Sequence, residues 1–123
     1  MLIEWNDVEH KPKIVATSKQ LGDAYYTLTV HDPDAPNPAF VHYMRVNICG
    51  KHMDRSRTCL VVPWMSPSPP SGETHRYVVR LTRQNTEWSP CPVVRSRSRF
   101  NIHDVRGDCV RTITRLADST GFV

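Results

Sequence analysis

The sequence predicts a mainly β fold, and two observations support this. Segments rich in β-branched and aromatic residues recur along the chain, and such residues favour strands. Ten prolines against five glycines indicate rigid bends between short elements. With 123 residues, of which 39% are hydrophobic, the chain fits one domain (residues 1–123) with a modest core.

Five segments are expected to be strands. Residues 24–31, 41–49 and 75–83 are long and strongly patterned, whereas residues 13–17 and 59–63 are shorter. Two proline-rich stretches, DPDAPNP at residues 32–38 and SPSPPSG at residues 66–72, separate strands. Because proline donates no backbone hydrogen bond, both are predicted to be stiff loops.

Beyond residue 101 the pattern changes to helical spacing. Asp104 is suited to begin a helix, although Gly107 weakens this interpretation. The sequence therefore predicts one short helix near the carboxyl end beside the antiparallel sheet. Its apolar face would consist of Val105, Cys109, Ile113 and Leu116.

The formal charge of +4 is unevenly distributed. Nine arginines and three acidic residues lie between Arg76 and Arg115, and residues 95–99 are the densest part. Such a surface could contact an acidic partner, anionic lipid or nucleic acid, or could be an ordinary solvated face. The arginines are not interleaved with aromatic residues, which disfavours nucleic acid.

The sequence favours a cytoplasmic protein. No apolar run is long enough to span a bilayer, and the first residues lack the pattern of a signal peptide. The four cysteines are unevenly spaced and include no CxxC motif, so reduced thiols are expected and a disulfide framework is the second interpretation. These cysteines are Cys49, Cys59, Cys91 and Cys109.

Polar side chains continue the apolar faces of three predicted strands, since alternate residues of a strand share a face. They are Asp32, His42, His75 and Tyr77, each at or near a strand end. Their convergence predicts a pocket rimmed by the two proline loops. The apolar residues in phase with them are Tyr26, Leu28 and Val30; Met44, Val46 and Ile48; and Val79 and Leu81.

These residue types suit an anion. Imidazoles and a tyrosine hydroxyl donate hydrogen bonds, and Asp32 could orient a histidine or accept from an ammonium group of the ligand. Zinc bound by the histidines with Asp32 or Asp34 is a weaker alternative, because no close-spaced ligand motif is present. A hydrolase using a serine of the second proline loop lacks a GxSxG elbow. The sequence thus predicts a non-enzymatic site without a cofactor.

Three blocks resemble the phosphatidylethanolamine-binding protein family. They are DPDAP at residues 32–36, VHYMRVNI at residues 41–48 and PPSGETHRY at residues 69–77, in the order and spacing of the family. RFN at residues 99–101 resembles a further family segment. The resemblance implies a large antiparallel sheet packed on a smaller one, with few helices, and a pocket for phosphate-like anions and phospholipid head groups.

Carried over by motif, the implied ligand-binding residues are Asp32, Asp34, His42, Pro69, Pro70, His75 and Tyr77. Family members act mainly by binding and by modulating partners. The implied partners are therefore a phospholipid head group or phosphorylated ligand, and a protein kinase or other signalling protein, as for the Raf kinase inhibitor proteins.

Two departures from the family pattern bear on the site. Ser68 stands before the two prolines, where many animal members have glycine. The chain ends at Val123, whereas animal and plant members continue to a carboxy-terminal helix that borders the pocket. A short form without this helix would have a more open site, or an edge that a second subunit could cover in a homodimer.

Overall fold

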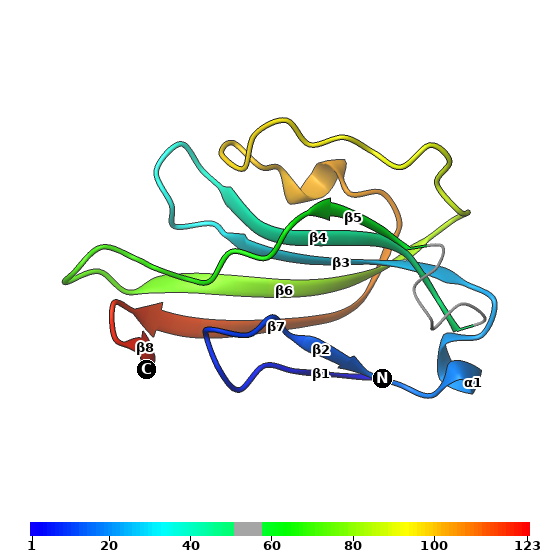
Figure 1. Ribbon diagram of the computed structural model, residues 1–123, viewed down its shortest axis with the longest axis horizontal. Helices are drawn as coiled ribbons and strands as arrows, with labels where there is room; N and C mark the ends of the chain where they lie inside the picture. Colours follow the sequence, from blue (N-terminus) through cyan, green and yellow to red (C-terminus); the bar gives the residue numbers. More distant parts are fainter. Residues whose placement is uncertain (51–57) are drawn as a thin grey trace.

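The computed structural model describes residues 1–50 and 58–123 (Figure 1). Its main feature is a six-stranded antiparallel sheet in the order β5-β4-β3-β6-β7-β8. A smaller sheet pairs β1 with β2. This arrangement confirms the predicted mainly β fold with a large and a small sheet. The strands are β1 (Leu2–Glu4), β2 (Lys13–Val15), β3 (Tyr25–Asp32), β4 (Phe40–Cys49), β5 (Cys59–Val62), β6 (His75–Gln84), β7 (Asp108–Asp118) and β8 (Gly121–Phe122).

Helical structure in the described part of the chain is limited to single turns. The helix α1 (Ser18–Leu21) begins at a capping box, in which the Thr17 side chain accepts from the Gln20 backbone and the Gln20 side chain accepts from the Thr17 backbone. Near the carboxyl end, η2 (Ile102–Asp104) is one turn of 3₁₀ helix.

The helix predicted over residues 105–116 is wrong, because most of this segment is strand β7. Gly107 has φ 127°, and a Cβ there would lie 2.1 Å from the backbone oxygen of Arg83. This close approach brings the chain alongside β6, with which β7 then pairs from Asp108 to Ala117. The β-branched residues between them suit a strand better than a helix.

One face of the large sheet packs on the small sheet. The core between them includes the predicted apolar residues of β3 and β6, with Ile3 and Trp5 from the amino-terminal layer. The Trp5 ring lies edge-on to the rings of Trp64, Tyr77 and Phe122, at centroid distances of 5.9, 6.5 and 4.9 Å. The large-sheet residues in this core are Tyr26, Leu28, Val30, Tyr43, Tyr77, Val79, Leu81 and Ala117.

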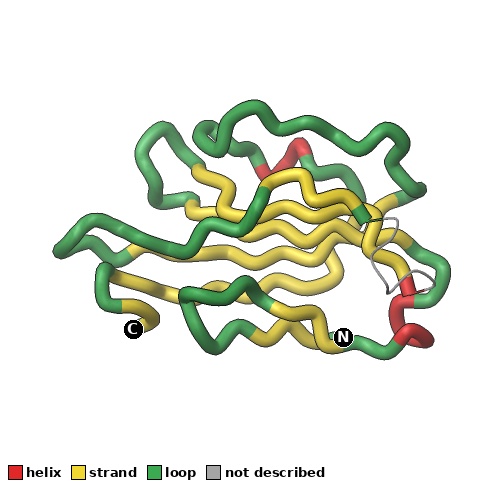
Figure 2. Tube along the Cα trace, in the orientation of Figure 1, coloured by secondary structure: helices red, strands yellow, loops and turns green. Residues whose placement is uncertain are grey.

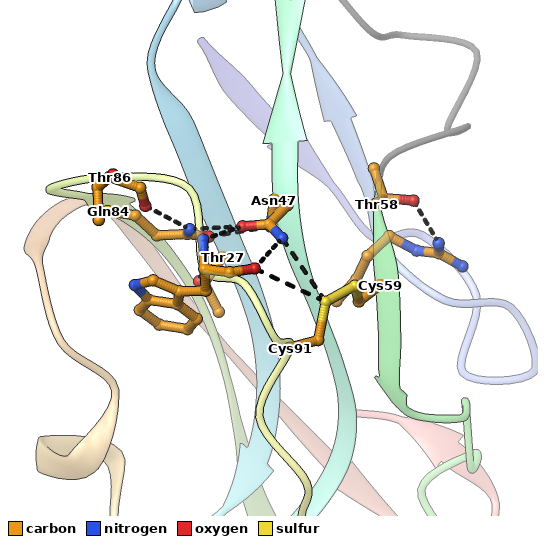
Figure 3. The surroundings of a disulfide bond; sticks show 9 residues. Thr27, Asn47, Thr58, Cys59, Gln84, Thr86 and Cys91 are labelled. Carbon is orange, nitrogen blue, oxygen red and sulfur yellow. Dashed lines mark hydrogen bonds between the residues drawn. A yellow bond between two sulfur atoms is a disulfide. The ribbon is translucent and has the colours of Figure 1, made fainter.

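The irregular segment 85–101 covers part of the opposite face, over β4 and β5 (Figure 1). A buried polar network attaches it to the sheet (Figure 3). The Asn47 side chain accepts from the backbone of Trp88 and from the side chain of Gln84, and Gln84 in turn accepts from the Thr27 hydroxyl. The second core cluster consists of Val41, Met44, Val46, Val62 and Val105.

A disulfide joins the same segment to β5, which corrects the prediction of four reduced thiols. Cys59 and Cys91 are bonded, with their Cα atoms 6.4 Å apart (Figure 3). Cys49 and Cys109 are free. The two bonded residues are 32 positions apart in sequence, and only the return of segment 85–101 over β5 brings them together. The cytoplasmic prediction loses the support it drew from reduced thiols.

The loops that follow β3 and β5 and the segment between β2 and β3 lie at the ends of the large sheet, whereas segment 85–101 runs along it (Figure 2). Both proline loops lie at one end, and α1 lies at the other (Figure 1). Each end holds a pocket on the face that carries the small sheet.

Candidate functional site

A pocket of about 480 Å³, open to solvent, lies where β3 ends and where β4 and β6 begin. The two proline loops form its rim, as predicted. Six of the seven predicted site residues line it: Asp32, His42, Pro69, Pro70, His75 and Tyr77. The remaining lining residues are Ala35, Pro36, Phe40, Met65 and Ser68.

Asp32 fixes the orientation of His75. The carboxylate oxygen Oδ2 of Asp32 accepts from Nδ1 of His75 at 2.6 Å, and both side chains are buried. The other oxygen, Oδ1, accepts from the backbone N–H of Asp34 at 2.8 Å, which closes an Asx turn at the start of the first proline loop. Asp32 therefore both shapes the loop and positions the histidine.

A second carboxylate, that of Glu73, accepts a hydrogen bond from Nε2 of His75. Nε2 of His75 lies 3.0 Å from Oε1 of Glu73, whose side chain is 56% exposed. Because both carboxylates can only accept, the ring is doubly protonated in this arrangement. The Glu73 hydrogen bond, followed by the hydrogen bond and charge of Asp32, raises the pKa of His75 above its usual value.

A β-bulge places His42 in the pocket. Val30 pairs with Tyr43 and His31 pairs with Val41, so His42 is the extra residue in β4. Strand period predicts that His42 shares the face of Met44, Val46 and Ile48, and this prediction is wrong. Met44 and Val46 belong to the core on the opposite face. The bulge turns His42 towards Tyr77, with ring centroids 5.3 Å apart.

His42 has one nitrogen committed to the protein. Nδ1 donates to the carbonyl oxygen of Met65 at 2.7 Å, and the Met65 N–H donates to the His42 carbonyl at 2.9 Å. Burial lowers the pKa of His42, although the Met65 carbonyl acts in the opposite direction. The neutral ring therefore carries its proton on Nδ1 and has an acceptor lone pair on Nε2.

Tyr77 lies between the two histidines. Its ring is 6.4 Å from that of His75, nearly parallel to it, and edge-on to that of His42. Burial, followed by the nearby charge of Asp32, raises the pKa of its hydroxyl. The hydroxyl therefore stays protonated at neutral pH, and a side-chain hydrogen bond to Asp32 adds to the shift.

Asp34 is the predicted site residue that does not line the pocket. Its carboxylate accepts from the backbone and the guanidinium of Arg76, with the shortest contact at 2.7 Å from Nη2 to Oδ1. This pairing holds the pKa of Asp34 at about 2. Asp34 and Arg76 are thus an ion pair that links the first proline loop to β6.

Arg97 holds the backbone of the pocket wall by hydrogen bonds. Its guanidinium donates to the carbonyl oxygens of Val41, His42 and Pro63, at 3.3, 3.1 and 2.7 Å. These acceptors lie in β4 and just after β5. Arg97 therefore ties the strand that carries His42 to the end of β5.

Glu73 and Phe40 were missed by the sequence analysis. Phe40 lines the pocket and contacts the His42 ring, at 4.9 Å between centroids. Glu73 stands two residues before His75, which is the spacing of two side chains on one face of an extended chain. That spacing was a usable signal, but the predicted strand began at His75.

The described part of the chain contains no group of three or more His, Cys, Asp or Glu residues suited to hold a metal ion. In the same residues, no helix has the length and apolar character needed to cross a bilayer.

The chain is thus a small protein with a large and a small β-sheet. It has a pocket at its proline loops that is lined by two histidines. The phosphatidylethanolamine-binding protein family matches residues 3–108, and the chain belongs to this family.

Two plant proteins are among its relatives. Over 83 residues the chain is 39% identical to protein MOTHER of FT and TFL1 homolog 2 of Oryza sativa subsp. japonica. This match covers 63% of the chain and 46% of the relative. Over 97 residues the chain is 31% identical to protein BROTHER of FT and TFL 1 of Arabidopsis thaliana. This second match covers 74% of the chain and 53% of the relative. The matches thus span about half the length of these relatives.

Proposed function

We propose that the protein is a non-enzymatic binding module for a phosphate-like anion, such as the head group of a phospholipid or another phosphorylated ligand. The ligand would occupy the pocket between His42 and His75 and would serve a regulatory role. The family membership and the arrangement of donors in the pocket support this proposal.

The observation that carries the proposal is the Glu73 carboxylate on Nε2 of His75. This nitrogen belongs to a ring that Asp32 holds in place and whose raised pKa favours the positive form. It already holds an oxyanion supplied by the protein itself, on a side chain that is mostly exposed. A phosphate oxygen can make the same charge-assisted hydrogen bond after Glu73 swings away.

His42 adds a proton-dependent contact. In its neutral form Nε2 is an acceptor, so it suits a protonated phosphate oxygen or a ligand ammonium group. When the ring is protonated, Nε2 becomes a charged donor to phosphate. Since burial lowers the pKa of His42, this second mode requires mildly acid pH.

The test is an NMR titration of histidine side-chain signals with inorganic phosphate and, separately, with phosphoethanolamine. Phosphate should shift the signals of His42 and His75, and its affinity should rise as the pH falls through the lowered pKa of His42. Phosphoethanolamine should bind more tightly than phosphate if the amine contacts an acidic group of the pocket.

Three variants complete this experiment. His75→Ala should abolish the shift at His42, and Tyr77→Phe, which keeps the ring, should weaken binding without unfolding the protein. His103→Ala, at an exposed histidine outside the pocket lining, is the matched control and should bind as the wild type does. Absence of shifts at both pocket histidines in saturating phosphate would remove the proposal.

A second candidate is a protein-interaction regulator resembling the Raf kinase inhibitor proteins, with a vestigial pocket. Arg95 and Arg99 are exposed on segment 85–101, which Arg97 and the disulfide fasten to the sheet. This geometry presents two positive charges on a fixed surface, which suits an acidic partner such as a phosphorylated signalling protein. Binding of a protein kinase that survives His75→Ala but is lost in the Arg95→Gln, Arg99→Gln double variant would favour this candidate.

A further inference from the structure

A second pocket, of about 610 Å³ including its open mouth, lies on the same face of the large sheet near the end that carries α1. It is separate from the histidine pocket and shares none of its lining residues. Its apolar wall comes from the small-sheet layer, α1, β3 and β4. Ile14, Leu21, Leu28 and Ile48 are among the apolar side chains that these elements contribute.

Arg45 introduces a positive charge into this apolar wall. It pairs with Leu28 across β3 and β4, so its side chain leaves the sheet on the face where the apolar core lies. Within residues 1–50 and 58–123, its hydrogen-bond acceptors are the Tyr43 hydroxyl, at 2.8 Å from Nε, and the Thr58 hydroxyl, at 2.9 Å from Nη1. Both acceptors are neutral.

The charge of the guanidinium is thus not matched by an acid of the described chain. A guanidinium has five N–H donors, and the two hydroxyls accept from only two of them. The half-buried Lys11 also lines the pocket, and no described lining residue is acidic. A half-buried positive centre beside an apolar cavity is the arrangement that favours a ligand with an anionic head and an apolar body.

We propose that this pocket binds an amphipathic anion with a single acyl or alkyl chain. The carboxylate or phosphate of the ligand would accept from the N–H groups of Arg45 for which residues 1–50 and 58–123 supply no acceptor, with Lys11 adding a second positive charge. The chain would lie against Ile14, Leu28 and Ile48, where it would remove apolar surface from water.

The experiment uses the whole chain and three probes of equal chain length: decanoate, decyl phosphate and decanol, each below its micelle concentration. Binding is followed by calorimetry and by the NMR signals of the Ile14, Leu28 and Ile48 methyl groups and of the Arg45 side chain. Decanoate or decyl phosphate should bind at least about tenfold more tightly than decanol, because a charge-assisted bond to Arg45 is added. The tighter of the two anions identifies the preferred head group.

Arg45→Met keeps the length and the apolar stem of the side chain. It should weaken the anions about tenfold and leave decanol unchanged. Arg83→Met, at an exposed position of β6, is the matched control and should leave all three affinities unchanged. Should Arg45→Met fail to fold, Lys11→Met gives the same comparison with a smaller loss of anion affinity.

Equal binding of decanol and the two anions would overturn the proposal, as would failure of both anions to shift the methyl signals. The signals of His42 and His75 provide the internal check. They should remain in place during the decanoate titration, because that site lies at the other end of the sheet.

Discussion

At the scale of single residues, the two pocket histidines differ in how the protein uses their nitrogens. His75 has a carboxylate on each nitrogen, and its pKa is raised; His42 has one nitrogen on a carbonyl, is buried, and its pKa is lowered. The raised pKa of His75 stabilises the fold fully below its unfolded value of about 6.5, and this contribution is lost as the pH rises through the folded value. The lowered pKa of His42 contributes to the stability of the fold above a pH of about 6.5, the pKa of the unfolded state. This contribution is lost as the pH falls through the pKa of His42 in the folded state.

Replacing Glu73 by Gln tests whether this residue competes with phosphate. The variant keeps the shape of the side chain but removes the charge on Nε2 of His75. Phosphate affinity should rise about two- to fivefold, since an exposed ion pair contributes up to about 1 kcal/mol. The pKa of His75 should fall, because the hydrogen bond to the Glu73 carboxylate is the largest cause of its raised value. The affinity is measured by an NMR titration with phosphate, and the pKa by an NMR titration with pH.

Glu4→Gln is the control for the loss of one negative charge, at an exposed position of β1 outside the pocket lining. An unchanged or weaker phosphate affinity in Glu73→Gln, relative to Glu4→Gln, would show that Glu73 does not occupy the anion position.

At the scale of elements, segment 85–101 is held by attachments and not by regular structure of its own. Asn47 lies in the left-handed region, with φ 60°, and is 2% exposed. Its backbone N–H, its side-chain amide and its side-chain oxygen all have partners in Gln84, Trp88 or Cys91 (Figure 3). The network and the disulfide therefore act together to keep Arg97 against the pocket wall.

Removing the disulfide should destabilise the protein. The bond closes a loop between residues 32 positions apart, for which the chain-entropy model gives about 3 to 4 kcal/mol. We expect the free energy of unfolding of the Cys59→Ser, Cys91→Ser double variant to fall by about this amount in urea denaturation. Cys109→Ser, at the exposed free cysteine, should change it by less than about 0.5 kcal/mol. Equal stability of the two variants would mean that the attachment rests on the polar network.

At the scale of the whole molecule, the small sheet is joined to the large one around Trp5. The guanidinium of Arg115 on β7 donates to the Trp5 carbonyl and lies over the Phe122 ring, 3.9 Å from its centroid. The Trp5 ring also contacts Tyr77, a lining residue of the histidine pocket. Packing between the two layers thus supports the floor of the candidate site.

Arg115→Met should weaken the joint between the layers. It removes a hydrogen bond to the Trp5 carbonyl and a cation–π contact, which together are worth about 1 to 3 kcal/mol. Thermal unfolding should show this loss, whereas Arg111→Met, at an exposed position on the same face of β7, should show almost none. A similar melting temperature for the two variants would indicate that apolar packing alone holds the small sheet.

Much of the architecture was predictable because it depends on local pattern. The strands β3, β4 and β6 begin and end within one residue of their predicted bounds. The alternation of apolar residues and the proline loops that mark these bounds are local features of the sequence. The small helix α1 was also readable from its capping box at Thr17 and Gln20, but it was missed. By contrast, β7 was misassigned as helix because Cys109, Ile113 and Leu116 recur at helical spacing, although Cys109 and Leu116 are exposed in the strand.

The site was predictable in membership more than in geometry. Asp32, His75 and Tyr77 follow the strand period, whereas His42 reaches the pocket only through a bulge in β4. The Glu73 contact to His75 depends on how the second proline loop returns to β6. Neither feature has a periodic signal, because each arises from pairing between segments distant in sequence.

The sequence by itself determined a mainly β protein whose strands bring Asp32, His75 and Tyr77 towards two proline loops. Strand period and proline chemistry are local, so they suffice for that. Tertiary structure decided which carboxylates hold His75, that Asp34 pairs with Arg76 outside the pocket, and that Cys59 bonds to Cys91. It also placed Arg45 beside a second, apolar pocket. These contacts join residues brought together by sheet order and by the return of irregular segments, which no local pattern encodes.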